Sequence, residues 1–362
     1  MTTTPVELAW FGCDLRTGGI VEDLRSIKPT GPLTRKLGDS TTLQFELNIP
    51  GAPTGWDAAT APGRSALVAV DTATNTPIWA GAVLTRPGGS SQTVQLGAIT
   101  LEGYLNSRYP GDQTLIGTDQ AAVVSALVTP ALTSGPPIVI DAPTIGVAMD
   151  YTTVNGDDKT ILSCLQEVMG LDGGPEWTVD VVWNGTQGFQ FPLRVRAAIG
   201  TQASPPEATF DFPGCVDSYT LTESYEAGKG ATRVIARGEG EGTSRLTSTV
   251  HDATALIANG WPVWEYRFTP ATGIDDPDQL DAHATQSLAL MQSGGQVWSI
   301  EAVASRAPRL GRDWFLGDNV RLAVEPGRSP RHPAGVDVTA RCWSWELDPG
   351  ADKVRPILVE EN

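Results

Sequence analysis

The chain has 362 residues, of which 40% are hydrophobic and 19% charged, and its 42 acidic against 25 basic residues give a formal net charge of −17. This length and apolar content indicate a globular protein of two or three domains and exclude a disordered chain. The acidic excess argues against general affinity for DNA or anionic membranes, because like charges repel at long range.

The four cysteines, Cys13, Cys164, Cys215 and Cys342, are far apart and form no C-x-x-C pair. This spacing argues against a zinc site or a dense disulfide framework, so we interpret them as reduced, small apolar side chains of a protein made in a cytosol. The N-terminal segment lacks the basic start and apolar run of a signal peptide. We expect no membrane span, since no stretch approaches about 18 consecutive apolar residues.

The first 108 residues have the pattern of short strands. Residues 42–49 alternate apolar with polar side chains, which predicts a strand with one buried face. Residues 66–71, 77–86 and 94–104 follow as further strands, separated by segments of hairpin length. Four or more such strands predict a small antiparallel barrel or sandwich over residues 1–108.

The pattern then changes to mixed helix and strand. Residues 118–132 and 157–170 have helical periodicity, with Thr118 expected to cap the first helix and Gly170 to end the second. Asn184-Gly185 has the sequence of a tight hairpin turn between two further strands.

Strand character returns in residues 209–244, a helix is predicted from about residue 277 to Gly294, and strands resume from 296. The charge follows the same division, because residues 109–208 and 245–295 together carry −12 of the net −17. We therefore predict a mainly β (α+β) protein with two small antiparallel β-barrels. Barrel one is formed by residues 1–108 and barrel two by 209–244 with 296–362, while 109–208 and 245–295 are two parts of one acidic inserted mixed α/β domain.

Motifs for nucleotide or metal chemistry are weak. Residues 227–232, AGKGAT, contain a Gly-Lys pair, but Lys229 is followed by Gly230 and a strand, where a phosphate loop needs Ser or Thr and a helix. His251, His283 and His332 share no metal-ligand spacing. We expect no cofactor and no metal.

A glycosidase pair stays open at this stage. Glu265, Asp275 and Asp276 lie near Trp261, Trp264 and Tyr266 in the sequence. Such enzymes need two carboxyl groups held about 5 to 9 Å apart in a cleft, and nothing in the sequence fixes such a pair. Solvated surface charge is the favoured interpretation.

The segment 306–331 carries the remaining candidates. Gly317-Asp318 could be an active-site loop or the turn that begins a strand. The arginines of the segment could contact nucleic acid, but the acids among them favour salt bridges at subunit or ring contacts, and few aromatic side chains are interleaved for base stacking. The candidate contact residues are Arg306, Arg309, Arg312, Asp313, Arg328 and Arg331, with Arg321, Asp318 and Glu325 as neighbours.

Four stretches together resemble a known family. They are TTLQFELNIP near residue 42, PIWAGAVLTR followed by ITLEGYLNSRY, the helix and Trp-bearing strand from residue 156 to 181, and LGDNVRLAV with the closing WSWELDPGADKVRPIL. In this order the chain resembles the tail-tip hub proteins of long-tailed (siphovirus) phages, which are related to contractile-tail baseplate hubs and type VI secretion spikes. In that family the Gly-Asp pair opens a barrel strand, which implies a structural turn at Gly317 and Asp318.

The resemblance implies a function and partners. Three copies would each give two barrels to a pseudo-sixfold ring at the distal end of the virion tail, assembled in the host cytoplasm. The implied partners are a distal tail protein that joins the tube, a tape measure protein, and tail fibre or receptor-binding proteins, with DNA passing through without specific binding. The implied role is structural and not enzymatic. A wall-polysaccharide-degrading enzyme and a receptor-binding module stay open as alternatives.

Overall fold

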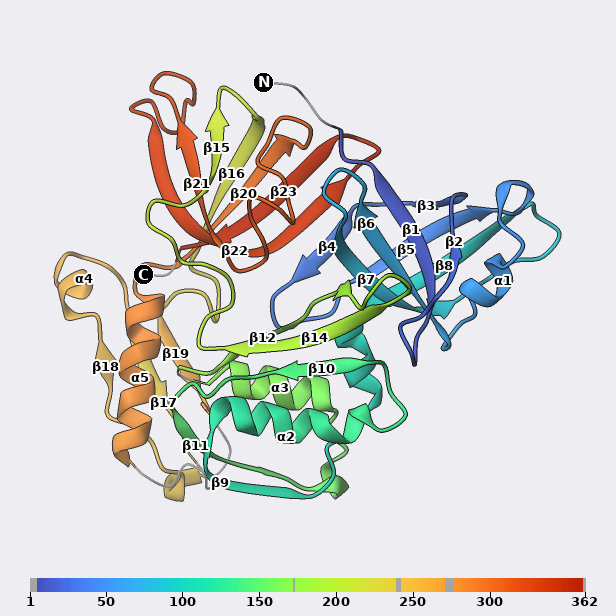
Figure 1. The fold of residues 1–362 in the computed structure, drawn as a ribbon. Coiled ribbons are helices and arrows are strands. Elements are labelled where there is room, and N and C mark those ends of the chain that lie inside the picture. The colour runs from blue at the N-terminus through green and yellow to red at the C-terminus, as the bar shows by residue number, and fades with distance from the viewer. Residues whose placement is uncertain (1–4, 172, 239–241, 271–276, 361–362) are drawn as a thin grey trace.

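The computed structural model describes residues 5–171, 173–238, 242–270 and 277–360. The chain folds into two curved seven-stranded sheets with two smaller α/β units packed beside them (Figure 1). This arrangement confirms the predicted mainly β fold. Among the described residues, no helix is both long enough and apolar enough to cross a membrane.

The first sheet is strongly curved (Figure 1), and we call it barrel 1. Its strand order is β2-β1-β6-β7-β8-β5-β3. Trp10 of β1 and Phe45 of β5 lie toward opposite ends of this order, yet their ring centroids are 5.1 Å apart, and both contact Trp79 of β7. The strands are β1 (Leu8–Asp14), β2 (Ile20–Asp23), β3 (Ile27–Pro29), β5 (Thr42–Asn48), β6 (Ser65–Asp71), β7 (Thr76–Thr85) and β8 (Thr93–Thr100).

The second sheet, which we call barrel 2, has the order β15-β21-β22-β23-β20-β16. Its seventh strand is β4 (Leu33–Lys36), which comes from the barrel 1 part of the chain and pairs with β22. One pairing departs from the predicted antiparallel pattern, because β15 runs parallel to β21. The strands are β15 (Ala208–Phe212), β16 (Val216–Ser224), β20 (Gly295–Val303), β21 (Asn319–Val324), β22 (Val336–Asp348) and β23 (Lys353–Val359).

The two barrels share one strand order. The path β1-β6-β7-β8-β5-β3 of barrel 1 corresponds, strand by strand and in sequence order, to the path β15-β21-β22-β23-β20-β16 of barrel 2. β22 is therefore the counterpart of β7. The connection between β3 and β5, which contains β4, is the counterpart of the long connection between β16 and β20.

A middle unit follows barrel 1 in the chain. Helices α2 and α3 pack against a sheet of order β10-β14-β12, and the two-stranded ribbon β11-β9 lies beside them (Figure 1). Asp119, and not Thr118, caps α2, because its carboxylate accepts the Ala121 N–H at 3.0 Å. Its elements are β9 (Gln113–Asp119), α2 (Gln120–Leu132), β10 (Ile138–Asp141), β11 (Ala148–Thr153), α3 (Ile161–Met169), β12 (Glu176–Val179), β13 (Val182–Trp183) and β14 (Phe189–Arg196).

A small unit fills the connection between β16 and β20. Helix α5 covers a sheet of order β18-β17-β19, and the two enclose a separate core that includes Val234, Ala236 and Leu280. Its elements are β17 (Arg233–Ala236), η4 (Gly242–Ser244), β18 (His251–Asp252), α4 (Thr254–Ala258), β19 (Glu265–Phe268) and α5 (Pro277–Met291). The remaining short helices of the chain are η1 (Ile49–Gly51), α1 (Trp56–Ala59), η2 (Leu101–Ser107) and η3 (Asn155–Asp157).

These units correct two of the predicted domain boundaries. The first part of barrel 2 ends with β16 at Ser224 and not at residue 244, because β17 pairs with β18 and β19 of the small unit. The predicted single insertion, 109–208 with 245–295, is two units with separate cores. Strand periodicity shows that residues 233–236 form a strand, but it carries no information about which sheet that strand joins.

Candidate functional site: the junction of the barrels and the middle unit

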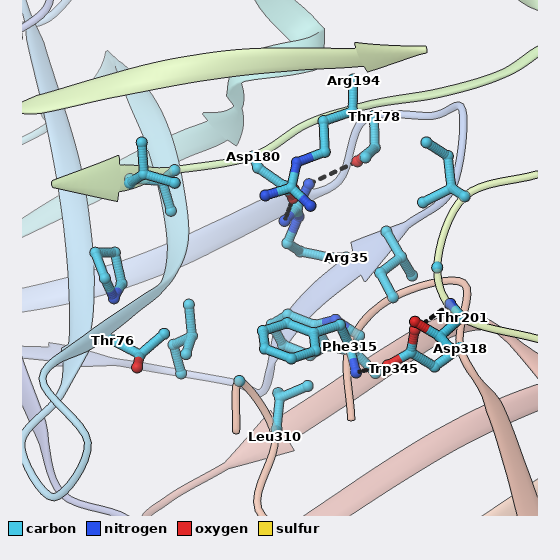
Figure 2. Close-up of a pocket in the computed structure, with 18 of the residues that line it drawn as sticks. Arg35, Thr76, Thr178, Asp180, Arg194, Thr201, Leu310, Phe315, Asp318 and Trp345 are labelled. Atoms are coloured by element: carbon cyan, nitrogen blue, oxygen red, sulfur yellow. Dashed lines mark hydrogen bonds and ion pairs between the residues drawn. The ribbon is translucent and has the colours of Figure 1, made fainter. Parts of the chain in front are cut away.

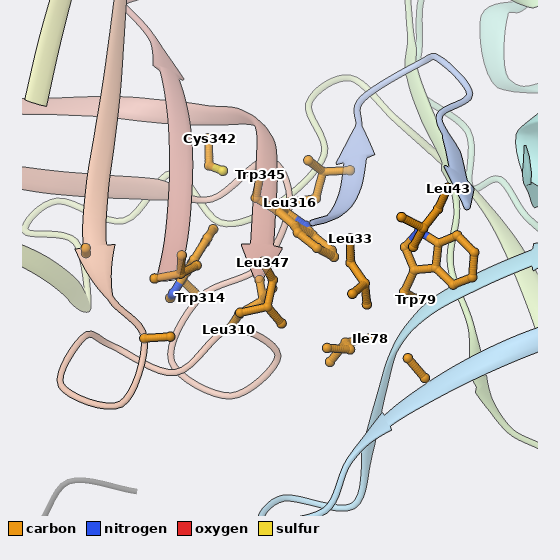
Figure 3. Packing of buried hydrophobic residues seen from close by; sticks show 14 of the residues in the cluster. Leu33, Leu43, Ile78, Trp79, Leu310, Trp314, Leu316, Cys342, Trp345 and Leu347 are labelled. Atoms are coloured by element: carbon orange, nitrogen blue, oxygen red, sulfur yellow. The ribbon is translucent and has the colours of Figure 1, made fainter. Parts of the chain in front are cut away.

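The two barrels are joined by a continuous apolar core. In the pairing of β4 with β22, Leu33 is opposite Leu347 and Arg35 is opposite Trp345. Leu33 is fully buried between Leu347 of barrel 2 and Trp79 of barrel 1, whose indole N–H donates to the Thr34 carbonyl at 3.3 Å (Figure 3). A strand exchanged between sheets adds backbone hydrogen bonds to this apolar contact, so the barrels are linked both by β4 and by a shared core.

A buried ion pair makes a second link between the barrels. Arg309, in the connection between β20 and β21, donates from Nε and Nη2 to the two carboxylate oxygens of Asp71 at 2.8 and 2.6 Å. Asp71 ends β6 of barrel 1, and both side chains are almost completely buried. Burial raises the pKa of Asp71, but the hydrogen bonds from Arg309 and the Ala73 N–H outweigh it, so this pKa lies below its usual value.

Arg35 of β4 links the barrels to the middle unit. Its guanidinium donates to Asp180 Oδ1, Thr178 Oγ1 and the Val179 carbonyl, each at 2.7 Å. It also lies 3.3 Å from Glu102 Oε1, which belongs to the helix η2 that follows barrel 1. Arg35 therefore neutralises carboxylates from two units in a buried position.

Arg341 of β22 makes the corresponding link from barrel 2. Its Nη1 and Nη2 donate to the two carboxylate oxygens of Glu176 in β12, each at 2.6 Å. The second Glu176 oxygen also accepts the Ile199 N–H at 2.7 Å. This geometry is the bidentate arrangement that fixes both the distance and the orientation of two groups.

A cavity of about 630 Å³ lies where barrel 1, the middle unit and barrel 2 meet (Figure 2). Residues 75–78 line it from barrel 1 and residues 180–183, with Thr178, from the middle unit. The lining residues from barrel 2 include Leu310, Gly311, Phe315, Leu316, Asp318 and Trp345. The charged groups on its wall already have partners, since Asp180 binds both Arg35 and Arg194. The wall of the cavity therefore provides mainly apolar contact surface and few groups free to react.

Gly317 and Asp318 form a turn at the edge of this cavity. Gly317 has a φ of +88°, and a Cβ there would lie 2.3 Å from the Ile199 carbonyl oxygen. The Asp318 carboxylate accepts the Thr201 N–H at 2.6 Å and the Phe315 N–H at 2.7 Å. Burial raises the pKa of Asp318, although these two N–H groups oppose the shift. The pair joins the exit of the middle unit to the start of β21.

The candidate contact arginines are paired within the chain. Arg312 donates two hydrogen bonds to Asp313, both at 2.8 Å, and Arg328 lies 3.6 Å from Glu325. Arg306 lies 3.8 Å from Asp217, Arg331 binds Glu223, and Arg321 binds Asp337.

Arg309 corrects the prediction that it makes a subunit or ring contact. Its side chain is buried between the two barrels of one chain, so its partner, Asp71, is intramolecular. The physical reason is that the connection from β20 to β21 folds over the end of β6.

The acidic and histidine residues considered for catalysis or metal binding do not come together in one site within the described residues. Glu265 binds Arg267, and Asp275 and Asp276 lie outside the described residues. His251 contacts Asp281, while His332 contacts Tyr219 in barrel 2. Within the described residues, no group of three His, Cys, Asp or Glu side chains is placed to hold a metal ion.

Sequence reasoning missed the residues that hold the junction: Arg35, Asp71, Glu102, Glu176 and Arg341. A signal was present for Arg341, which stands between Ala340 and Cys342 within a strand whose central positions are buried. An arginine at such a position needs a carboxylate partner, although the sequence does not say which one.

The sequence matches no protein-family model and no curated protein, but several solved structures share its fold. A tail protein from Neisseria meningitidis MC58 is similar with a TM-score of 0.60 over 98% of this chain and 97% of that chain, at 15% identity. The 43 kDa tail protein of prophage MuSo2 from Shewanella oneidensis has a TM-score of 0.57 over 98% of both chains, at 11% identity. Prophage tail protein gp18 from Listeria monocytogenes EGD-e has a TM-score of 0.55 over 98% and 94%, at 10% identity.

A chain of the PdpA–VgrG complex of Francisella is also similar, with a TM-score of 0.54 at 6% identity. The match covers 97% of this chain but only 52% of that one. The shared fold therefore covers 94% or more of three tail proteins and part of a longer chain. These likenesses confirm the tail-protein fold that the resemblance implied.

Proposed function

We propose that this protein is a structural hub of a phage tail tip, and that three copies form a ring of six barrels that joins the tail tube to the host-adsorption apparatus. The observation that carries the proposal is the repeated strand order of the two barrels, within a fold shared from end to end with phage tail proteins. A chain with two equivalent barrels presents two equivalent surfaces, which suits head-to-tail closure into a ring.

The contacts at the junction support a structural role. Leu33, Arg309 and Arg341 each tie one unit of the chain to another through buried contacts. A hub must keep its two barrels at a fixed angle, because a ring closes only if every interface has the same geometry. The sequence alternatives, a wall-degrading enzyme and a receptor-binding module, do not require this rigidity.

The electrostatics fit a conduit for DNA. The net charge is −17, and the arginines of the 306–331 segment are engaged by carboxylates of the same chain. Each unpaired arginine on a channel wall would add a salt-dependent attraction to phosphate. A distal tail protein, a tape measure protein and fibre proteins are the partners that this position in the tail would require.

The mass of the purified protein tests the proposal. We expect light scattering to give a particle of three 38.3 kDa chains, and electron microscopy of tails to place it at the distal end. A monomer that persists at high concentration and is missing from tails would contradict the hub. We also propose that the protein is not an enzyme, and release of reducing sugar from host cell walls by the pure protein would contradict that.

A further inference from the structure

The correspondence between the barrels identifies the small unit as the counterpart of the β4 connection. Within the chain, the connection between β3 and β5 leaves barrel 1 as β4 and packs on the last residues of β22 in barrel 2. The counterpart connection in barrel 2 is the one between β16 and β20, which is the small unit. The counterpart of β22 is β7 of barrel 1.

The small unit carries exposed apolar side chains that its own core does not use. Val263 and Trp264 are 47% and 50% exposed, and Trp261 is 43% exposed. Trp261 and Trp264 both flank Tyr225, just after β16, with ring centroids 5.5 and 6.0 Å from it. Such a cluster at one site is typical of a surface that another protein covers.

The end of β7 has a complementary feature. Leu84, the next-to-last residue of β7, is 55% exposed, although residues 78–83 just before it are buried. The counterpart region of β22, Ser344 to Leu347, is covered by β4, and Leu347 is almost completely buried.

The two surfaces cannot meet within one chain. Figure 1 shows the small unit on the side of the molecule away from barrel 1, while β4 lies on the side of barrel 1 that faces barrel 2. A second copy of this chain, placed relative to barrel 2 as barrel 2 is placed relative to barrel 1, would bring its own β7 to the small unit.

We propose that Trp261, Val263 and Trp264 of one copy cover Leu84 at the end of β7 in a neighbouring copy. This contact repeats between chains the role that β4 has within the chain. It rests on the proposed ring, and it names the surfaces that close it. Burial of two tryptophans and a leucine would give the contact the aromatic anchors that dominate stable interfaces.

The first experiment measures assembly in a matched pair of variants. We expect Val263→Ser with Trp264→Ser to convert the trimer to monomer in light scattering, with an unchanged circular dichroism spectrum. Leu290→Ser is the control, because Leu290 is 53% exposed on α5 of the same unit and is not one of the side chains proposed to cover Leu84, so this variant should stay trimeric. A trimeric double variant would overturn the inference and leave the hub proposal standing.

The second experiment uses cross-linking between chains. The four native cysteines are buried, so a variant with Leu84→Cys mixed with a variant with Trp264→Cys has one reactive thiol on each chain. A short bis-maleimide should give a covalent pair that neither variant gives alone, and Leu290→Cys in place of Trp264→Cys should give none. If the cross-link forms but the wild-type protein is a dimer or tetramer, the contact stands and the trimer is overturned. If the protein is monomeric and gives no cross-link, the contact and the trimer are both overturned.

Discussion

Arg309 and Asp71 form a two-bond ion pair that is almost fully buried, between residues 238 positions apart in the sequence. Arg309 also donates to the Pro5 carbonyl at 3.1 Å. Removal of one buried partner leaves the other charge without compensation in a medium that solvates it poorly. The folded protein is therefore stable only when barrel 1 and barrel 2 are placed so that Arg309 and Asp71 meet.

Asp71→Asn should destabilise the protein strongly. It leaves the Arg309 charge buried, and we expect a loss of roughly 3 to 5 kcal/mol in the free energy of unfolding, measured by urea denaturation. The matched control is Arg312→Met, which removes a solvent-exposed partner of Asp313 and should cost about 0 to 1 kcal/mol. Equal losses in the two variants would contradict the assigned role of the buried pair.

Replacing both partners should recover much of that loss. In Asp71→Leu with Arg309→Met, no charge remains buried, and the two apolar side chains occupy the space between the barrels. Buried ion pairs replaced by apolar groups of similar volume are often close to neutral in stability. We expect the double variant to unfold at a higher urea concentration than Asp71→Asn, and the reverse order would show that packing and not charge limits this site.

The effect of Asp71→Asn should depend on pH. Because the folded-state pKa of Asp71 is depressed, its contribution to stability is present above the unfolded value of about 4 and is lost as the pH falls through the folded value. The stability difference between wild type and Asp71→Asn should thus be largest near neutral pH and shrink below about pH 4. Denaturation midpoints of both proteins from pH 7 to pH 3 test this, and a constant difference would contradict it.

Local sequence patterns predicted the elements well and their partners poorly. The alternation in residues 42–49 predicted β5, whose burial alternates as expected over Thr42–Asn48. Ile161, Leu165 and Val168 are buried in α3 as the helical stripe predicted. β4 was missed, because four residues between Pro32 and Leu37 form a strand only through pairing with β22, some 300 residues later in the chain.

The junction was hidden for the same reason. Arg35, Asp180 and Glu102 come from three separate stretches of sequence, and their convergence depends on how the barrels and middle unit pack. The 306–331 arginines were visible as a cluster, yet Arg309 differs from Arg312 in burial and in its partner, neither of which sequence spacing reports. The sequence showed where the charged residues cluster, but only the fold shows that Arg309 is buried between the two barrels.

The cysteines should be unreactive in the native protein. All four are buried, and burial raises the pKa of Cys13 and of Cys215 to about 12. The thiolate is the reacting species, so a disulfide reagent at pH 8 should label the folded protein slowly and label four thiols after unfolding in guanidinium. Rapid labelling of one thiol in the folded state would show that a unit opens locally.

Gly317→Ala should be far more damaging than Gly63→Ala. Both glycines have positive φ, +88° and +70°, so each substitution carries a backbone cost of about 1 to 2 kcal/mol. A Cβ at Gly63 would meet no atom within 4 Å, whereas one at Gly317 would lie 2.3 Å from the Ile199 carbonyl oxygen, in backbone that cannot shift alone. Ile199 also donates to Glu176 and accepts from Arg341, so a displacement there would disturb the link between β12 and β22.

We expect Gly317→Ala to lower the thermal unfolding midpoint well below that of Gly63→Ala. Equal midpoints would show that the close approach at Gly317 does not fix the junction.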